Sequence, residues 1–335
     1  MSNKNSNLQS AKNTKDDEFY TTYETVEKEL SHYGYHFENR TVLCNCDDPY
    51  ESNFCKYFLL NFNKLKLKRL ICTSYAGSKM MFNKELYNGR KSKKQGYVLD
   101  VSSIKDFAES DSIIEYIVEN DLIHEMEGNG DFRSDECVNY LRQSDIIVTN
   151  PPFSLFRELI SLIMDNNKKF LLISNQNALT YSEIFPLIQN NIVWTGFQFG
   201  EMKFRVPPTS KERKTRFWID SKGQKWRSLG NAMWLTNLDN EKRHQLVKMS
   251  KSYNDIDYPK YDNYDAINVK TINDIPSDYF GIMGVPITFM NRYNSEQFEI
   301  IGEANHGSDN EYDLFKPTIN GKDIFKRILI KRKVQ

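Results

Sequence analysis

The sequence of 335 residues predicts an α/β fold of the doubly wound kind, in which helices cover both faces of a sheet. Short runs of β-branched and apolar residues alternate with segments whose apolar residues recur at helical spacing. The clearest run, residues 146–149, is followed at once by Asn150, Pro151 and Pro152. Open α/β sheets bind their ligands at the carboxyl ends of their strands, so we expect Asn150 to face a site.

The charge balance limits the kind of partner that the chain can bind. It has 45 basic and 45 acidic side chains, so its formal net charge is zero. A net charge of zero counts against nonspecific electrostatic attraction to nucleic acid. It does not exclude DNA binding through a local basic surface. No apolar run approaches the length of a membrane span, and residues 1–15 form a polar tail without an apolar signal core. We expect this tail to be disordered and the protein to be cytoplasmic.

The five cysteines are odd in number and lack C-x-x-C spacing, which predicts reduced and mostly buried thiols. A zinc site built on Cys44 and Cys46 is the weaker alternative, and we expect no metal. The sequence also lacks the H-E-x-x-H, G-x-S-x-G and P-loop patterns, and its five histidines are scattered. Metal-dependent hydrolysis and triad chemistry are therefore not expected.

In the first part of the chain, a helix that ends near Leu30 is expected ahead of a strand over residues 40–46. Asp48 followed by Pro49 is a typical helix start, with Asp48 as the N-cap. Asp47 and Asp48 at the strand end also suit a ligand that carries an ammonium group. The simpler alternative is that Asp48 only caps the helix.

The next strands are expected over residues 67–74 and 97–101, and a helix is expected to begin near Asp111. Residues 128–132, with the sequence Gly-Asn-Gly-Asp-Phe, predict a tight turn that carries one carboxylate just ahead of the run 146–149. A glycine-rich loop without a ligand is the alternative.

Residues 150–153 predict a site that activates an amino group on a ring. An exocyclic amine is a poor nucleophile because its lone pair is delocalised into the ring. Acceptors aimed at its hydrogens, here the Asn150 side-chain oxygen and the Pro151 carbonyl, would shift the nitrogen toward sp³ geometry. The Phe153 ring would stack on the substrate ring, so catalysis would work by positioning and electrostatics. The alternative is a proline turn with Phe153 in the core. Ser154 is expected to cap the next helix.

A basic insert is expected between two strands late in the catalytic region. Strands are predicted over residues 169–174, 191–200 and 231–238, the last two as a pair. Between them, residues 201–230 hold nine basic and three acidic residues, a net charge of +6, around a hairpin signature at 220–223. A basic, aromatic hairpin suits contact with a DNA backbone, and a solvated hairpin is the alternative. The expected DNA-binding residues are Lys203, Arg205, Lys214, Arg216, Lys222, Lys225 and Arg227.

Five stretches of the chain carry a resemblance to a known family. They are residues 44–54 (CNCDDPYESNF), 128–134 (GNGDFRS), 150–156 (NPPFSLF), 281–286 (GIMGVP) and 320–322 (NGK). Together they resemble the EcoRI-type adenine-specific DNA methyltransferase family, from about Asp17 to about Ile330.

The resemblance implies a Rossmann-like methyltransferase fold that uses S-adenosylmethionine to methylate adenine N6 in duplex DNA. It implies that Asn150, Pro151, Pro152 and Phe153 are catalytic. The residues that it assigns to cofactor binding are Phe19, Tyr20, Thr21, Asn45, Asp47, Asp48, Asp131, Phe132 and Asn150. Among these, Asp131 would accept a hydrogen bond from the cofactor's adenine amine, and Phe132 would pack near the adenine ring.

The chain departs from the common methyltransferase pattern at three points. No glycine-rich loop follows the first strand, and Thr22 stands where a proline usually follows Thr21. Ser74 and Tyr75 replace the acidic residue that often binds the ribose. The ribose ligand is therefore unassigned, and the role of residues 19–21 rests on the resemblance alone.

We therefore expect a catalytic domain over residues 16–240, with the hairpin insert 201–230, and a small target-recognition region over 241–335. The expected function is site-specific restriction-modification methylation of an adenine that leaves the DNA stack, in a bacterial or phage-encoded enzyme. Expected partners are double-stranded DNA and a cognate restriction endonuclease as a functional counterpart. The alternatives are methylation of an RNA base or a protein glutamine, and an inactive DNA-binding homologue.

Overall fold

The computed structural model describes residues 19–76, 95–107, 111–304 and 317–334. The polar tail, residues 1–15, lies outside these ranges. The chain divides into two compact units, Met1–Asn175 with Phe197–Leu238, and Gln176–Gly196 with Asp239–Gln335. The second unit combines the region assigned to target recognition with residues 176–196, which lie within the expected catalytic domain. Within the described ranges, no helix is both long and apolar enough to cross a membrane.

A ten-stranded sheet, counted over the described residues, forms the centre of the first unit. Four parallel neighbours, β7, β6, β2 and β3, make its middle, and antiparallel strands β10 and β4 flank them. The full order is β1, β8, β10, β7, β6, β2, β3, β4, β5, with β9 paired to β10. The strands are β1 (Tyr20–Thr21), β2 (Thr41–Cys44), β3 (Arg69–Ser74), β4 (Tyr97–Val101), β5 (Ile123–Glu125), β6 (Ile146–Thr149), β7 (Lys169–Asn175), β8 (Trp194–Arg205), β9 (Phe217–Ile219) and β10 (Lys225–Thr236).

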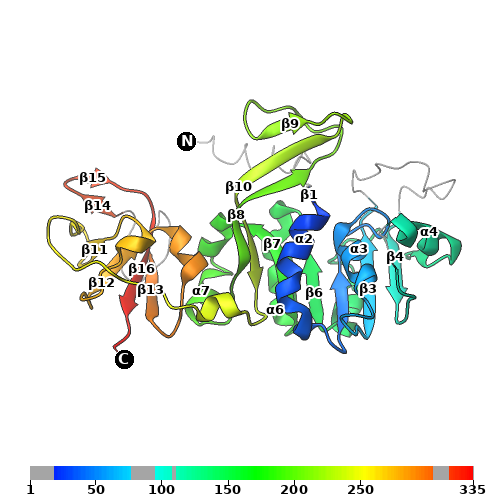
Figure 1. Cartoon of the computed structure of the whole chain (residues 1–335), viewed down its shortest axis with the longest axis horizontal. Coiled ribbons are helices and arrows are strands. Elements are labelled where there is room, and N and C mark those ends of the chain that lie inside the picture. The colour runs from blue at the N-terminus through cyan, green and yellow to red at the C-terminus, as the bar shows by residue number, and fades with distance from the viewer. Residues whose placement is uncertain (1–18, 77–94, 108–110, 305–316, 335) are drawn as a thin grey trace. The chain divides into compact units, whose positions relative to one another are not determined.

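Helices cover both faces of this sheet, which confirms the doubly wound fold (Figure 1). Val42 and Cys44 of β2 share a core cluster with Phe58 of α3 on one face. Leu43, between them, is also fully buried, and it points to the opposite face because side chains alternate along a strand. The helices are α2 (Tyr23–Leu30), α3 (Asn53–Leu60), α4 (Asp111–Glu119), α5 (Asp135–Gln143) and α6 (Phe156–Asp165), of which α3 packs on β3, α5 on β2 and α6 on β7.

Helix α3 begins at Asn53, so the prediction that Asp48 is its N-cap is wrong. Ser52 caps the helix, because its hydroxyl accepts from the first backbone N–H groups at 3.1 and 3.4 Å. Asp48 instead closes a separate turn by accepting from the Tyr50 N–H at 2.9 Å. As a result, Asp47 and Asp48 lie in the irregular segment between β2 and the helix.

The prediction that Ser154 caps the helix after β6 is also wrong. A 3-10 turn, Phe153–Leu155, follows the two prolines, and α6 begins at Phe156 without a side-chain cap. The buried residues Leu159, Ile160 and Ile163 give this helix its apolar side.

The basic insert contains the expected hairpin. Strand β9 pairs antiparallel with the first part of β10, with Trp218 opposite Trp226, and the two rings stack with centroids 6.2 Å apart. At the turn, Asp220 accepts from two backbone N–H groups at 2.9 and 3.0 Å. Gly223 has a φ of +77°, a conformation that favours glycine. Figure 1 shows this hairpin projecting beyond the ends of the central strands.

The second unit holds α7 and two small sheets. Gln189 of α7 donates to the carbonyls of Ile300 and Ile301, both at 3.1 Å, which ties residues 176–196 into this unit. The strands expected over residues 298–301 and 324–330 are confirmed as β13 and β16. The elements are α7 (Phe185–Gln189), the four-stranded order β11 (Ile267–Asn268), β12 (Ile282–Val285), β16 (Arg327–Arg332), β13 (Phe298–Ala304), and the pair β14 (Thr318–Ile319) with β15 (Lys322–Asp323).

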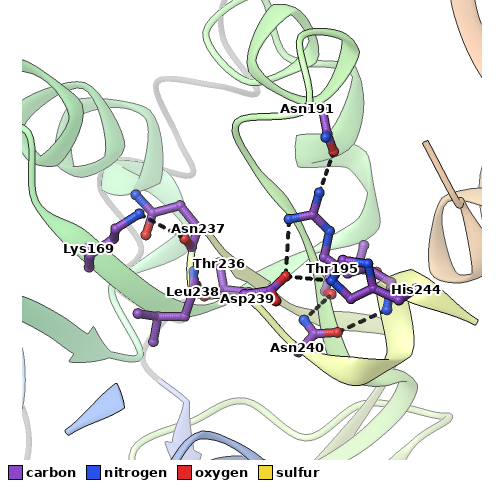
Figure 2. Close-up of polar contacts among 10 residues, drawn as sticks. Lys169, Asn191, Thr195, Thr236, Asn237, Leu238, Asp239, Asn240 and His244 are labelled. Carbon is purple, nitrogen blue, oxygen red and sulfur yellow. Dashed lines mark hydrogen bonds and ion pairs between the residues drawn. The ribbon is translucent and has the colours of Figure 1, made fainter. Parts of the chain in front are cut away.

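Side-chain hydrogen bonds fix the chain on each side of the boundary between the units (Figure 2). In the first unit, Lys169 Nζ donates to the Asn237 carbonyl at 3.3 Å, next to the end of β10. In the second unit, Asn240 caps the 3-10 turn Glu241–His244 by accepting from the Arg243 N–H at 3.1 Å. The first of these hydrogen bonds lies within the first unit and the second lies within the second unit.

Candidate active site

A cavity of about 700 Å³ lies in the first unit, beside the residues that follow β2 and β6. This volume falls in the range of small-molecule sites, about 300–1,000 Å³. Except for Phe153, every residue that the sequence analysis assigned to catalysis or cofactor binding lines it. These residues are Phe19, Tyr20, Thr21, Asn45, Asp47, Asp48, Asp131, Phe132, Asn150, Pro151 and Pro152.

The amide of Asn150 is held by the segment that contains β1. Its Nδ2 donates to the Phe19 carbonyl at 2.5 Å and to the Thr21 hydroxyl at 3.2 Å. Because both hydrogens of the amide are engaged, the side-chain oxygen is fixed as the group that can accept from a substrate. Asn150 itself is half-buried at the end of β6.

Phe153 packs against the same segment. Its ring stacks on that of Phe19 with centroids 5.5 Å apart and an interplanar angle of 27°. The guanidinium of Arg227 also lies over the Phe19 ring, 5.0 Å from its centroid. Phe153 is half-buried.

Asp47, which follows β2, is hydrogen-bonded to Thr149, the last residue of β6. Its carboxylate accepts from the Ser52 hydroxyl at 2.7 Å and from the Thr149 hydroxyl at 2.6 Å. Burial raises the pKa of Asp47 to about 7, although these two hydrogen bonds oppose the rise. Asp47 is therefore a buried carboxyl with a pKa close to neutral pH.

Asn45 offers a test of whether the cavity suits a polar ligand. Its side chain is 3% exposed and lines the cavity, and none of the described residues donates a hydrogen bond to its oxygen. Leaving a buried acceptor unsatisfied costs about 1–3 kcal/mol. A ligand that donates a hydrogen bond here would remove that cost, so Asn45 fits a ligand that carries a hydroxyl or amino group.

The turn at residues 128–132 is packed closely against β3. Gly130 has a φ of +76°, and a Cβ added to it would lie 1.9 Å from the Ser74 carbonyl oxygen. Only glycine therefore fits at this position. The turn brings Asp131 and Phe132 to the cavity, where Ser74 and Tyr75 also lie.

Asp131 is already engaged by a neighbour that sequence reasoning missed. Arg133 donates to both carboxylate oxygens at 2.9 and 2.7 Å, and it also contacts Glu158 of α6 at 2.8 Å. The Arg133 guanidinium lowers the pKa of Asp131, which stays ionised and keeps capacity for one more donor. Nothing in the sequence pattern indicates the contact with Glu158.

The basic insert contributes to the cavity as well as to the surface. Its turn and first paired residues, Asp220, Lys222, Gln224 and Trp226, line the cavity together with Arg205. Trp226 is fixed by its indole N–H, which donates to Asp220 at 2.8 Å. Sequence reasoning missed these roles, because it treated the insert as a DNA-facing surface only.

The seven basic residues assigned to DNA differ in exposure. Lys203, Lys214, Arg216 and Lys222 are exposed. The remaining three are half-buried: Lys225 donates to the Ser210 carbonyl at 2.9 Å, Arg227 lies over Phe19, and Arg205 lines the cavity.

Comparison with known proteins identifies the family. The pattern of the family described as adenine-specific methyltransferase EcoRI matches residues 7–333. The chain is 44% identical over 330 residues to the Type II methyltransferase M.EcoRI of Escherichia coli, covering 97% of this chain and 96% of the relative. It is 36% identical over 296 residues to M.MgeORF184P of Mycoplasma genitalium, with coverages of 87% and 84%. It is 35% identical over 298 residues to M.MpnI of Mycoplasma pneumoniae, with coverages of 87% and 83%.

No solved structure matches the chain. The family pattern covers nearly all of the sequence and confirms the resemblance seen in residues 44–54, 128–134 and 150–156. The chain therefore belongs to the EcoRI family of adenine-specific methyltransferases.

Proposed function

We propose that this protein, a DNA adenine methyltransferase of the restriction-modification type, uses S-adenosylmethionine to methylate N6 of an adenine that has left the duplex. The observation that carries the proposal is the Asn150 amide, whose nitrogen is bound by Phe19 and Thr21 inside a cavity lined by buried carboxyls. This arrangement presents an oxygen acceptor to an amino group and an acidic wall to a cationic cofactor.

The residues of the cavity fit the cofactor. The unsatisfied oxygen of Asn45 suits a hydroxyl or amino donor, and Asp131 keeps capacity to accept from an adenine amine. Asp47 and Asp48 suit an ammonium group. When bound, S-adenosylmethionine supplies an electrophilic methyl group on a positively charged sulfur.

The chain's own residues act on the amine. The Asn150 oxygen and the Pro151 carbonyl accept the two hydrogens of adenine N6, which draws the nitrogen toward sp³ geometry and exposes its lone pair. The Asn150 oxygen is fixed before the substrate arrives by the two hydrogen bonds of its amide nitrogen, so it needs little reorganisation in the transition state. Pro152 lacks an N–H and therefore does not compete as a donor at this point.

Access to these groups requires base flipping. In duplex DNA, adenine N6 is paired with thymine, whereas Asn150 lies half-buried at the end of β6. Extrusion costs a few kcal/mol, and stacking on an aromatic side chain returns about 1–3 kcal/mol. We assign this stacking to the face of Phe153 that is turned away from Phe19.

We assign the exposed basic residues of the insert to the DNA backbone and the second unit to target recognition. A cognate restriction endonuclease is the expected functional counterpart, as the Type II names of the relatives suggest. Because these relatives are bacterial and the substrate is DNA, we propose that the protein works in a bacterial cytoplasm.

Expression in a host that lacks adenine methylation, followed by methylation-sensitive sequencing, tests the proposal. We expect N6-methyladenine within one short sequence context for the wild type and none for Asn150→Ala. Unmodified DNA from a host that contains soluble, folded wild-type protein would contradict the proposal. Tritiated cofactor offered with duplex DNA, single-stranded RNA or a glutamine peptide separates the alternative substrates.

A further inference from the structure

Trp226 is an aromatic residue of the basic insert, and it lines the cavity. It lies near the start of β10 and is half-buried. Phe153, the aromatic residue of the segment 150–153, packs on Phe19 and is not one of the described residues that line the cavity. A flat ligand that enters the cavity beside the insert therefore has Trp226 as an aromatic neighbour.

Two contacts within the hairpin hold the Trp226 side chain. Its indole N–H donates to Asp220 at 2.8 Å, and its ring stacks on that of Trp218 with an interplanar angle of 7°. Trp218 is the residue opposite Trp226 in the pairing of β9 with β10. The polar end of the indole is thus satisfied and the ring is supported by a second ring, so its remaining apolar surface is presented to the cavity with little reorganisation.

Backbone hydrogen bonds fix the hairpin on both sides of this residue. The Lys225 carbonyl accepts from the Val206 N–H at 3.0 Å, which ties the start of β10 to the residue that follows β8. The Ser228 N–H donates to the Arg216 carbonyl, also at 3.0 Å. The position of Trp226 at the cavity is therefore set by strand pairing on either side of it along the chain.

The neighbours of Trp226 connect it to the groups that act on the amine. Arg227, the next residue, lies over the ring of Phe19, whose carbonyl accepts from the Asn150 amide. The residues assigned to the cofactor come largely from the segment after β2 and from the turn at 128–132. The insert thus approaches the cavity through the segment that positions Asn150.

The same hairpin carries the surface assigned to DNA. It projects beyond the ends of the central strands (Figure 1), and Lys203 and Lys214 of the insert are exposed. A duplex bound to these lysines would release its flipped base beside Trp226. An aromatic ring stacks on any base, because every base has a π-face, and such a contact strengthens binding by about fivefold to 150-fold per base.

We propose that Trp226 stacks on the flipped adenine and holds it in the cavity, in addition to the contact assigned to Phe153. The inference rests on the proposed methylation of an adenine that leaves the duplex. It makes the basic insert a part of the base-binding site as well as a surface for the DNA backbone.

The binding of two duplexes to the full-length protein, with S-adenosylhomocysteine present, tests this proposal. Both contain the recognition sequence found by methylation-sensitive sequencing. One carries the target adenine in a mismatch, which lowers the cost of flipping, and the other carries an abasic nucleotide at that position. We expect Trp226→Ala to weaken binding of the adenine duplex by about fivefold to 150-fold and binding of the abasic duplex by less than about twofold.

Matched variants come from the same hairpin. Trp226→Phe keeps an aromatic ring and should recover most of the affinity for the adenine duplex, whereas Trp226→Leu keeps apolar bulk without a π-face and should behave like Trp226→Ala. Trp218 is exposed and does not line the cavity. Because Asp220 still holds Trp226 in Trp218→Ala, its affinity for each duplex should stay within about threefold of the wild type.

Three results would overturn the proposal. Equal weakening of both duplexes by Trp226→Ala and Trp226→Leu would assign the ring to the DNA backbone or to the hairpin itself. Unchanged affinity for both duplexes would exclude a contact with the base. Calorimetric loss of S-adenosylhomocysteine binding in folded Trp226→Leu would assign the ring to the cofactor. If the wild type neither methylates nor binds the adenine duplex, the proposed function itself is wrong, which is a distinct outcome.

Discussion

The side-chain amide of Asn150 donates a hydrogen bond to the backbone carbonyl of Phe19, 131 positions earlier in the chain, at 2.5 Å. Its second donor bond goes to Thr21 in the same segment. Since Phe153 also stacks on Phe19, one short N-terminal segment positions both the Asn150 amide and the Phe153 ring. We expect changes in this segment to affect catalysis even where cofactor binding is intact.

Thr21→Val removes the hydroxyl that holds Asn150 and keeps the shape of the side chain. Loss of one neutral hydrogen bond costs about 0.5–1.5 kcal/mol, so we expect single-turnover methyl transfer to slow by about twofold to tenfold. Thr21→Ser retains the hydroxyl and serves as the control. Equal rates for the valine variant and the wild type would show that the Phe19 carbonyl alone positions the amide.

Phe153 has a predicted role in holding the flipped base. Phe153→Ala should slow transfer and weaken the base-flipping signal of 2-aminopurine placed at the target adenine, because about 1–3 kcal/mol of stacking is lost. Phe153→Tyr and Phe153→Trp should retain much of the activity. If Phe153→Ala methylates duplex DNA at the wild-type rate, the ring only packs on Phe19 and has no contact with the substrate.

Most of the residues predicted from the sequence line the cavity, because they come in short contiguous motifs near strand ends. The family resemblance assigned Asp47, Asp131 and Asn150 to one cofactor site, and all three line one cavity. Sequence reasoning failed where two capping residues compete, as at the start of α3. Asp48 and Ser52 are both good N-caps, and the tie between Asp47 and Ser52, which no local pattern encodes, favours the later start.

Charge composition alone was a poor guide to the position of Arg205, which lines the cavity. Its strand alternates exposed and buried positions, and the pairing with β1 directs this residue into the cavity. Pairing between residues about 185 positions apart depends on the register of the sheet, which is set by the packing of the whole domain. For the same reason, sequence reasoning missed that Trp226 and Asp220 line the cavity.

The raised pKa of Asp47, about 7, predicts a pH dependence of stability. In the unfolded chain an aspartate has a pKa of about 3.9. The folded protein therefore keeps a proton that the unfolded chain releases, and the free energy of unfolding should fall by a few kcal/mol as the pH rises from about 4 through about 7. Urea unfolding without cofactor measures this, and Asp47→Asn should remove that part of the decline.

Asp165→Asn changes an exposed carboxyl and should leave the wild-type pH dependence intact. Cofactor affinity should change in the opposite direction, rising with pH through about 7, because the ionised Asp47 attracts a cationic ligand. An Asp47→Asn variant that keeps both pH dependences would exclude Asp47 as their source.

The exposed lysines of the insert should govern the salt dependence of DNA binding. If Lys203 and Lys214 each neutralise one phosphate, replacing both with glutamine should lower the log–log slope by about 1.8. Lys64 and Lys68, exposed next to β3, provide a matched pair of substitutions that should leave the slope unchanged. Identical slopes for the wild type and the Lys203 and Lys214 double variant would assign these lysines to a solvated surface.

The most direct test concerns Asn150 itself. We expect Asn150→Ala to lower single-turnover methyl transfer to duplex DNA by several orders of magnitude, because the fixed acceptor for adenine N6 is lost. Affinity for S-adenosylhomocysteine, measured by calorimetry on the same preparation, should stay within about threefold of the wild type. Turnover in Asn150→Ala equal to that of the wild type would contradict the catalytic role of this residue.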